Sequence, residues 1–322
     1  MDDHGPGRLA RLLDRFGPFL GLVVVAGLFA AIAPSGFASV YNAKTILTQS
    51  VIVGVCALGM TFVIRSGGID LSVGSAIAFA SVVTALTMKA TGSAAVAALA
   101  GVAAGAAVGA VNGGLIAGLA LPPFIVTLGT LGAARGAAKW LAGEQKVDAP
   151  SGWFEQAMSK SSDAPLGLAP GIWLMLLGAV ATAFVLRRTV FGVWTTAIGS
   201  NERAALLCGV PVRRTKVWIY VLMGAAAGLA GVLQFGRLTV GDPTTATGKE
   251  LDVIAAVVIG GASLSGGSGT ILGTLVGALL MATLANGCNL SGVPNYVQEI
   301  LIGGIIVSAV ALDRLRKGGA RG

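Results

Sequence analysis

Charged residues are scarce in this chain of 322 residues. Asp, Glu, Lys and Arg make up 11% of it, less than half the roughly 25% of an ordinary soluble domain, whereas hydrophobic residues make up 55%. The mean hydropathy is +0.84. A soluble domain of this length needs more polar surface than these residues supply. The composition therefore excludes a soluble enzyme, a disordered protein and a nucleic-acid-binding module, so nucleic acid is not an expected partner.

Histidine and closely spaced cysteines are also lacking, which limits the chemistry that the chain can perform. The single histidine, His4, lies in a polar N-terminal tail. Cys56, Cys208 and Cys288 are far apart in the sequence, so no CxxC motif for metal or redox chemistry is present. A histidine-based triad or a zinc site has no residues from which it could be built. We therefore expect no catalytic and no metal-binding residues.

A nucleotide-binding site is not expected either. The segment 241–249 superficially resembles a phosphate-binding loop, but its spacing is wrong, and Glu250 stands where a magnesium-binding hydroxyl is needed. The chain is thus expected to be no enzyme and to hold no cofactor of its own, and any ATP and magnesium would be bound by another chain.

The sequence does contain a series of long, charge-poor apolar runs. A bilayer core is about 30 Å thick, so a spanning helix needs roughly 20 mostly apolar residues. The first run is too long for a signal peptide and precedes another membrane segment, which favours an uncleaved span. The pattern predicts an all-α polytopic membrane protein with about ten transmembrane helices. The candidate spans are 17–34, 45–65, 71–90, 94–118, 123–142 (which carries Arg135 and Lys139), 169–186, 217–236, 252–265 (short for a full span), 270–287 and 296–312.

The distribution of charge predicts the orientation of these helices. Segment 187–216 carries six basic residues and one acid, and the C-terminus is also basic, so both should be cytoplasmic. The loop 143–168 has four acids and two lysines, which fits the outside. Six spans before the basic loop and four after it place both termini in the cytoplasm. We expect a single transmembrane domain over 17–313 between cytoplasmic tails at 1–16 and 314–322.

An internal repeat relates two glycine-rich clusters. Residues 67–75 match residues 260–268 at six of nine positions, at an offset of 193. Many transporters are built from such repeats. Glycine permits positive φ, and a helix break at membrane depth persists only where it is buried in protein or lines a wet cavity. The residues that we name as helix-break or translocation-path candidates in these clusters are Gly67, Gly68, Asp70, Ser72, Gly74, Gly260, Gly261, Ser265 and Gly267.

Chance and helix packing can also account for glycines in these patterns. The match between the clusters can arise by chance in a chain rich in glycine and alanine, and small residues also serve close helix packing. For the scattered glycines Gly101, Gly105 and Gly109, which are spaced by four, packing is the favoured interpretation. For the two clusters, packing and helix breaks both stay open at this point.

Asp70 is an acid close to a membrane boundary, and it has two interpretations. An ionisable residue at such a place is a functional-site candidate. Asp is also a preferred N-cap, and the apolar helix that follows Asp70 favours this second interpretation. No ladder of buried acids accompanies it, so a proton relay through Asp70 is not expected.

The basic loop contains a short helix with recognisable ends. Asn201 can cap it, and Glu202 in the first turn suits the helix dipole. Gly209 stands at a plausible C′ position, and Pro211 prevents continuation. The apolar face can be buried in a groove of a soluble partner or on the bilayer surface. Its residues are Ala204, Ala205, Leu206 and Leu207.

Three blocks of sequence resemble the permease subunits of bacterial ABC importers of the ribose, xylose, arabinose and galactoside class, within the branched-chain-amino-acid-permease-like superfamily. They are 59–75, then 112–116 with 122–130, and 199–209 continuing to 220–222. The resemblance extends over nearly the whole chain after the N-terminal tail. Asn112, which opens the second block, joins the translocation-path candidates. Cys208 stands where many relatives have a small polar residue.

The resemblance implies a pore-forming subunit of the bacterial inner (plasma) membrane that works as a pair, either a homodimer or with a homologue. It also implies a cytoplasmic ATPase subunit and an extracytoplasmic sugar-binding protein as partners. In ABC importers a cytoplasmic helix with a Glu-x-Ala-Ala-x-x-x-Gly-like pattern docks into the ATPase, and Glu202, Ala204, Ala205 and Gly209 match it. Together with Asn201, these residues are our expected ATPase-coupling site, and the partner groove becomes the favoured interpretation of the short helix.

The expected function is ATP-driven import of a pentose or hexose delivered by the binding protein. Polyols and related small solutes stay open as substrates. The related permeases for branched-chain amino acids or nucleosides are the alternative within the class. A secondary transporter that works without an ATPase is the alternative from another class, but no convincing cluster for a coupling ion is present. A membrane scaffold without transport activity is a further alternative.

Overall fold

The computed structural model describes residues 8–33, 36–159 and 165–318, and these residues are mostly helical. The α-helices are α1 (Arg8–Ile32), α2 (Val40–Arg65), α3 (Val73–Thr91), α4 (Ala94–Gly118), α5 (Pro123–Ala142), α6 (Trp153–Met158), α7 (Pro170–Arg188), α8 (Val190–Ser200), α9 (Glu202–Leu207), α10 (Val212–Leu238), α11 (Lys249–Ile259), α12 (Ile271–Leu290) and α13 (Asn295–Gly318). A short 3₁₀ turn lies at Pro165–Gly167. The two strands, β1 (Val147–Asp148) and β2 (Val240–Gly241), pair antiparallel.

Six helices in the described part of the chain are long and apolar enough to cross a membrane: α2, α3, α4, α7, α10 and α12. Shorter apolar stretches occur in α1, α8 and α13. Large apolar side chains are exposed along α1 and α7, including Leu20, Val23, Leu177 and Val180. Such outward apolar faces suit lipid tails as their surroundings rather than water. The chain is therefore a polytopic all-α membrane protein.

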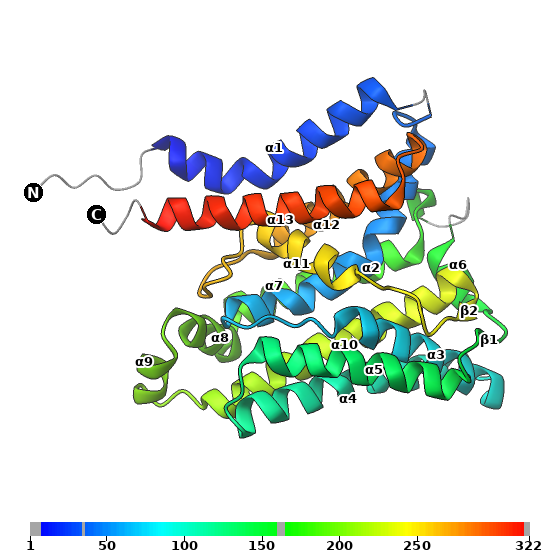
Figure 1. The fold of residues 1–322 in the computed structure, drawn as a ribbon, viewed down its shortest axis with the longest axis horizontal. Helices are drawn as coiled ribbons and strands as arrows, with labels where there is room; N and C mark the ends of the chain where they lie inside the picture. Colours follow the sequence, from blue (N-terminus) through cyan, green and yellow to red (C-terminus); the bar gives the residue numbers. More distant parts are fainter. Residues whose placement is uncertain (1–7, 34–35, 160–164, 319–322) are drawn as a thin grey trace, which may run out of the picture.

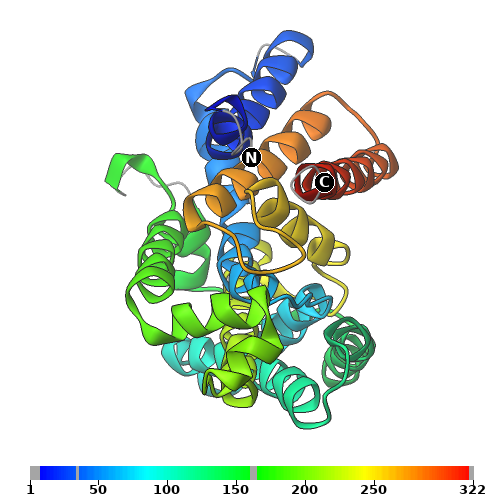
Figure 2. The ribbon, with the colours of Figure 1, turned by 90° about the vertical axis from the view of Figure 1, so that its left-hand side faces the viewer.

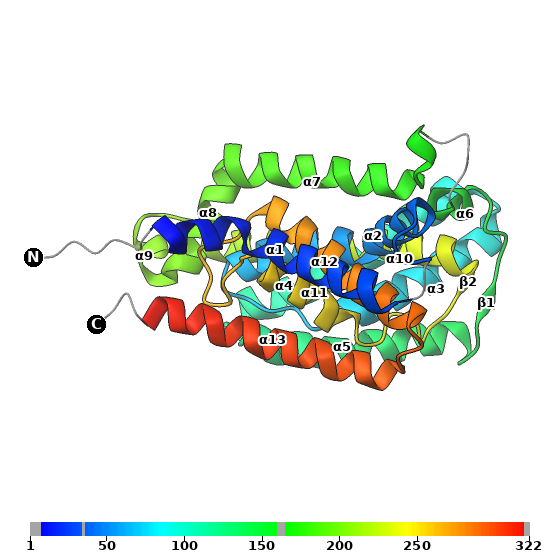
Figure 3. The same cartoon turned by 90° about the horizontal axis from the view of Figure 1, so that it is seen from above.

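The long helices run side by side along one direction of the molecule (Figure 1). The start of α1 and the end of α13 lie at the same end as α9, whereas β1, β2 and α6 lie at the opposite end (Figure 1). Viewed from the α9 end, α1, α12 and α13 group on one side of α2, and α4 and α5 lie on the other (Figure 2). From above, α7 and α13 lie along opposite edges (Figure 3).

Helix α2 forms the centre of the core, and glycines allow the closest helix pair beside it. Most residues of α2 from Ser50 to Ile64 are buried. Helices α4 and α10 approach so closely that a Cβ added to Gly105 would lie 2.5 Å from the Cα of Gly228. One added to Gly109 would lie 3.0 Å from the Cα of Gly224. The expectation that the spaced glycines of α4 serve packing is confirmed.

Several helix bounds differ from those expected. Helix α1 begins at Arg8, inside the expected N-terminal tail, and α13 continues to Gly318, inside the expected C-terminal tail. The expected span 252–265 contains only the short helix α11, which ends at Ile259. The reason is local, because Gly261 has φ +92°, a conformation that a helix cannot continue.

Arg135 finds partners that explain how α5 tolerates a cation. Its Nη1 donates to the carbonyls of Pro243 and Thr245 at 2.8 and 2.7 Å. Those carbonyls belong to the loop after β2, at the end that also carries β1. In the same loop, partial burial opposes ionisation of Asp242, but hydrogen bonds from Thr244 and the charge of Lys146 hold its pKa below the usual value.

Candidate functional site

Helix α9 has the ends that its sequence predicts. The Asn201 side chain accepts a hydrogen bond from the backbone N–H of Ala204 at 3.0 Å, so Asn201 is the N-cap. At the other end Gly209 has φ +81°. The N–H of Gly209 donates to the Leu206 carbonyl, and the N–H of Val210 donates to the Ala205 carbonyl, both at 3.0 Å. This pair of bonds is a Schellman motif, which requires the left-handed residue that glycine supplies.

Only one side of α9 is covered by the chain itself. Ala205 is buried and packs with Ile198 of α8 and Val212 of α10. Leu206 and Leu207 point away from this cluster, with 63% and 88% of their surface exposed. Ala204 is exposed as well. The predicted apolar face therefore divides: one alanine holds the helix in place, and two leucines remain uncovered.

An ion pair that sequence reasoning missed joins α9 to α10. Lys216 Nζ lies 2.7 and 2.8 Å from the two carboxylate oxygens of Glu202. The Lys216 side chain is 18% exposed, whereas that of Glu202 is 53% exposed. One edge of the Glu202 carboxylate thus remains open to a partner. Spacings of fourteen residues carry no helical signal, so nothing in the pattern pointed to this pair.

The first glycine cluster lies in the break between α2 and α3, one of the two interpretations that the sequence left open. Residues 66–72 are not helical, and Gly67 has φ +81°. Gly68 is tightly enclosed, because a Cβ there would lie 2.5 Å from the Tyr220 hydroxyl oxygen and 3.3 Å from Val63 Cγ1. A Cβ on Gly74 would collide with the backbone of Ala246 and the side chain of Glu250. Whether this break lines the translocation path stays a prediction.

Asp70 is not an N-cap, so that interpretation was wrong. The N-cap of α3 is Ser72, because the chain between Gly68 and Ser72 does not take up helical form. Asp70 Oδ1 accepts hydrogen bonds from the Ser72 amide at 2.8 Å and from the Ser72 hydroxyl at 2.6 Å. Asn112 Nδ2 of α4 then donates to the same hydroxyl at 2.9 Å. The structure thus brings Asp70, Ser72 and Asn112 into one buried polar cluster.

Two polar atoms beside this cluster lack partners within the described part of the chain. They are Asn112 Oδ1 and the Tyr220 hydroxyl. Both are buried, and buried polar groups in proteins are nearly always hydrogen-bonded. Tyr220 was not singled out by its sequence, because an aromatic residue in an apolar run is typical of a core.

The second cluster forms a loop of residues 260–270 between α11 and α12, which we call the glycine loop. Its start repeats the end of α2. Gly67 N donates to Ile64 O and Gly68 N to Val63 O, while Gly261 N donates to Val258 O and Ala262 N to Val257 O. The structural repeat therefore pairs Gly67 with Gly261, whereas the sequence match at an offset of 193 pairs Gly67 with Gly260. The glycine loop is also longer than the break at 66–72, so no single offset aligns both ends.

The other residues predicted in the second cluster serve different parts of this loop. A Cβ on Gly260 would lie 2.5 Å from the carbonyl carbon of Gly273. The Ser265 amide donates to the Ser263 hydroxyl at 3.3 Å, which shapes the turn. Gly267 lies against Ser200, at the end of α8. The glycine loop thus reaches the segment that carries the predicted coupling residues (Figure 1).

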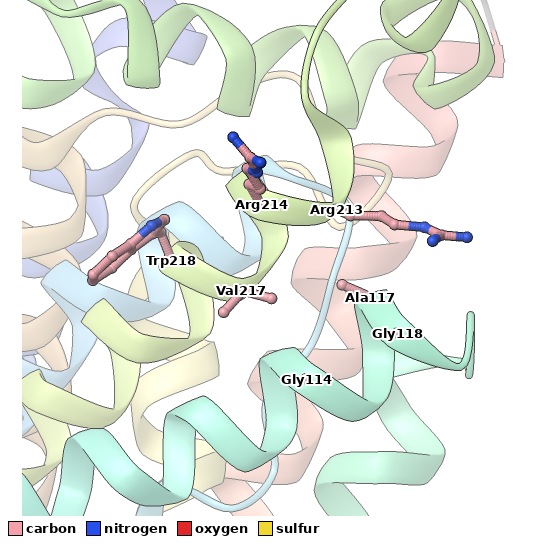
Figure 4. A pocket seen from close by; sticks show the side chains of 7 residues that line it. All are labelled: Gly114, Ala117, Gly118, Arg213, Arg214, Val217 and Trp218. Atoms are coloured by element: carbon pink, nitrogen blue, oxygen red, sulfur yellow. The ribbon is translucent and has the colours of Figure 1, made fainter.

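Two grooves open near the α9 end of the molecule. One, of about 380 Å³, lies between α4 and α10 and is lined by Gly114, Gly118 and Trp218 together with two arginines. Arg213 and Arg214 point in different directions, so they do not converge on one ligand (Figure 4). The other groove, of about 370 Å³, borders α9 and is lined by Leu206, Glu202, Lys216 and the turn between α4 and α5, among others.

No group of three metal-binding side chains occurs among the described residues. The described features are a multi-pass helical bundle with two broken helices and a capped helix projecting at one end. Such features are typical of membrane transport proteins.

Comparison with known proteins agrees with this class. A family model described as the permease component of the branched-chain amino acid transport system matches residues 42–310. The chain belongs to this permease family. No solved structure matches it significantly.

Curated relatives cover nearly the full length. The ribose import permease protein RbsC of Bacillus subtilis (strain 168) is 41% identical over 304 residues, which are 94% of this chain and 94% of that protein. The L-arabinose ABC transporter permease protein AraH of Azospirillum brasilense is 38% identical over 97% of this chain and 91% of that protein. The ribose permease of Escherichia coli (strain K12) is 38% identical over 92% and 93%.

Proposed function

We propose that this chain is the membrane-spanning subunit of an ATP-driven importer for a sugar, with a pentose as the preferred substrate. The observation that carries the proposal is the identity of about two-fifths, over more than nine-tenths of both chains, with permeases named for ribose and arabinose import. ATP and magnesium belong to a separate ATPase subunit, and an extracytoplasmic binding protein delivers the sugar.

The ATPase docks on α9 in this proposal. Leu206 and Leu207 are exposed beside a groove that the turn between α4 and α5 completes, and Glu202 stands at its edge. An amphipathic helix with uncovered leucines next to a groove of mixed apolar and charged lining is typical of a protein-docking surface. The short covalent connections to α8 and α10 would transmit movement of the ATPase to the bundle.

The chain crosses the bilayer ten times in this proposal, with both termini in the cytoplasm. The crossings are α1, α2, α3 with residues 66–72, α4, α5, α7, α10, α11 with the glycine loop, α12 and α13. Support comes from the basic residues near α9 and from the shared end of α1 and α13. The end with β1 and β2 faces outside and receives the binding protein. Two copies of the chain, or one copy and a homologue, form the complete pore in the inner membrane.

Reconstitution tests this function directly. The permease is purified together with an ATPase subunit and a sugar-binding protein from the same organism, and the complex is placed in liposomes. We expect uptake of labelled ribose or arabinose that requires ATP and the binding protein, and sugar-stimulated ATP hydrolysis. A branched-chain amino acid and a nucleoside serve as competing substrates. Uptake by the permease without the ATPase would contradict the proposal and favour a secondary transporter.

A further inference from the structure

Three segments of the chain meet at the C-terminal end of α2. Arg65, the last residue of α2, donates from Nε to the Thr196 hydroxyl of α8 at 2.8 Å. It also donates from Nη1 to the Gly269 carbonyl of the glycine loop at 2.9 Å. In addition, the Arg65 carbonyl accepts a hydrogen bond from the Gly267 amide at 2.9 Å. The arginine side chain thus joins α8 to the glycine loop, while its backbone joins the loop to α2.

The contact around these bonds is made by backbone atoms and leaves no space for added side-chain atoms. A Cβ on Gly199 of α8 would collide with the Arg65 carbonyl oxygen and lie 2.7 Å from the Gly267 nitrogen. A Cβ on Gly266 would lie 2.9 Å from the Cα of Gly199. One on Gly267 would lie 3.6 Å from the Cβ of Ser200. Closely packed segments of this kind move together, because the interior has little free volume to absorb a displacement.

The two sides of this contact lead to different functional parts. On one side α8 continues through the single residue Asn201 into α9, and Ile198 and Ala205 pack together across that joint. On the other side the glycine loop ends at Thr270, the N-cap of α12. Helix α12 in turn is tied to α2 within the core by a 2.9 Å hydrogen bond between the hydroxyls of Thr274 and Thr61.

We propose that Arg65 is a positioning residue that clamps α8 to the glycine loop. Movement of α9 is then passed through the loop to α12 and α11, the two helices that the loop connects. The inference rests on the proposed function, because it takes α9 as the contact with the ATPase. The first break begins in the same contact, because a Cβ on Gly67 would lie 3.9 Å from the Cα of Gly199, but its polar side chains reach instead toward α4, through Ser72 and Asn112.

Arginine suits this role better than lysine does. Its planar guanidinium donates from separate nitrogens in fixed directions, which lets one side chain hold two acceptors on two segments. Lysine concentrates its donors on one nitrogen and has no rigid fork. Arg188 provides a matched control, since it lies at the same end of the neighbouring α7, is exposed and has no hydrogen bond or ion pair within the described residues.

The first test measures the clamp without the ATPase. In a chain whose three native cysteines are replaced, Ser200→Cys and Gly267→Cys form a pair whose Cβ separation fits a disulfide. Gly267 has φ +78°, so a cysteine there is strained, and yields are compared only between chains that carry both cysteines. We expect the pair to cross-link rapidly under mild oxidation in membranes. The yield should fall several-fold when Arg65→Gln is added and should be unchanged by Arg188→Gln. An equal yield with and without Arg65→Gln would overturn the inference.

The second test measures coupling in the complete complex with ATPase and binding protein. Arg65→Gln should lower sugar-stimulated ATP hydrolysis by about fivefold or more, a typical size for coupling between sites, while the ATPase still co-purifies. Arg65→Lys and Thr196→Val should give intermediate losses, and Arg188→Gln none. Oxidation of the 200–267 cysteine pair in the Arg65→Gln chain should restore stimulation, because the disulfide replaces the lost bridge, and reduction should abolish it again.

The outcomes separate the two proposals. Normal stimulation in Arg65→Gln, or a loss that the disulfide does not restore, would overturn the clamp and leave the proposed function standing. A wild-type complex without sugar-stimulated ATP hydrolysis would overturn the proposed function itself, whatever the cross-linking yield.

Discussion

At the residue scale, the break between α2 and α3 is held by a few polar contacts in a crowded space. Asp70 shapes it locally, since both bonds to its Oδ1 come from Ser72. Tyr220 of α10 packs against the break, and its hydroxyl lacks a hydrogen-bond partner among the described residues. Because the Gly68 Cα faces that hydroxyl, the glycine and the tyrosine share one small volume.

A pair of substitutions tests this shared volume. Gly68→Ala should lower the melting temperature and sugar uptake, because overpacking a tight site costs about 1–3 kcal/mol. Tyr220→Phe alone should change little, since no hydrogen bond is lost. The double variant should recover most of the loss, because removal of the hydroxyl makes room for the methyl group. Thermal unfolding of the purified permease and uptake in liposomes measure both effects. A loss of uptake from Tyr220→Phe alone would instead assign the hydroxyl a role in transport.

At the element scale, α9 is a small helix that is well determined at both ends. Its N-cap, its Schellman motif and the Ala205 contact hold it in place within the chain. The ion pair between Glu202 and Lys216 adds little to this, since an exposed pair contributes about 0–1 kcal/mol. The exposed half of α9 is therefore free to serve a partner.

Substituting each partner of the ion pair in turn separates the two roles of Glu202, which are its bond to Lys216 and its proposed contact with the ATPase. Lys216→Gln should lower sugar-stimulated ATP hydrolysis less than Glu202→Gln does, because it removes only the exposed pair and one charge from the lining of the groove. Glu202→Gln and, more strongly, Glu202→Lys should lower it several-fold or reduce co-purification of the ATPase. The direct effect of the reversed charge on the helix dipole is only about 0.3–1 kcal/mol, so a larger loss reflects the partner contact. Equal losses from Lys216→Gln and Glu202→Gln would mean that the pair merely holds α9 on α10.

At the scale of the whole molecule, the two ends of the bundle differ in charge and in architecture. One end has α9 and a concentration of arginines, and the other has a two-residue β-ribbon and acidic loops. Under the positive-inside rule, this asymmetry predicts that the α9 end faces the cytoplasm.

Cysteine labelling in intact cells tests the orientation. In a chain without native cysteines, Gln156→Cys should react with a membrane-impermeant maleimide from outside, and Arg203→Cys should react only after the membrane is opened. Both positions are exposed, so access to the reagent and not burial decides the result. Labelling of position 203 from outside would reverse the proposed topology and remove α9 from the ATPase.

Local features were determined by the sequence alone. The apolar runs placed most helices, because the length of a spanning helix is set by the bilayer. Asn201 and Gly209 predicted both ends of α9, since capping depends on residues within one turn. Gly67 and Gly261 marked the two broken helices for the same reason: positive φ is a property of the single residue.

Only the tertiary structure decided which residues meet across those elements. The two side-chain partners of Arg65 lie 131 and 204 residues away in sequence, and the partner of Ser72 on α4 lies 40 residues away. Such pairs depend on how whole helices are rotated and offset against each other, and apolar runs without a polar face do not encode that rotation. The same reason explains why Arg65, Tyr220 and Lys216 became visible only once the helices were packed together. The error at Asp70 was local instead, because α3 begins after Ser72, and Asp70 hydrogen-bonds that residue.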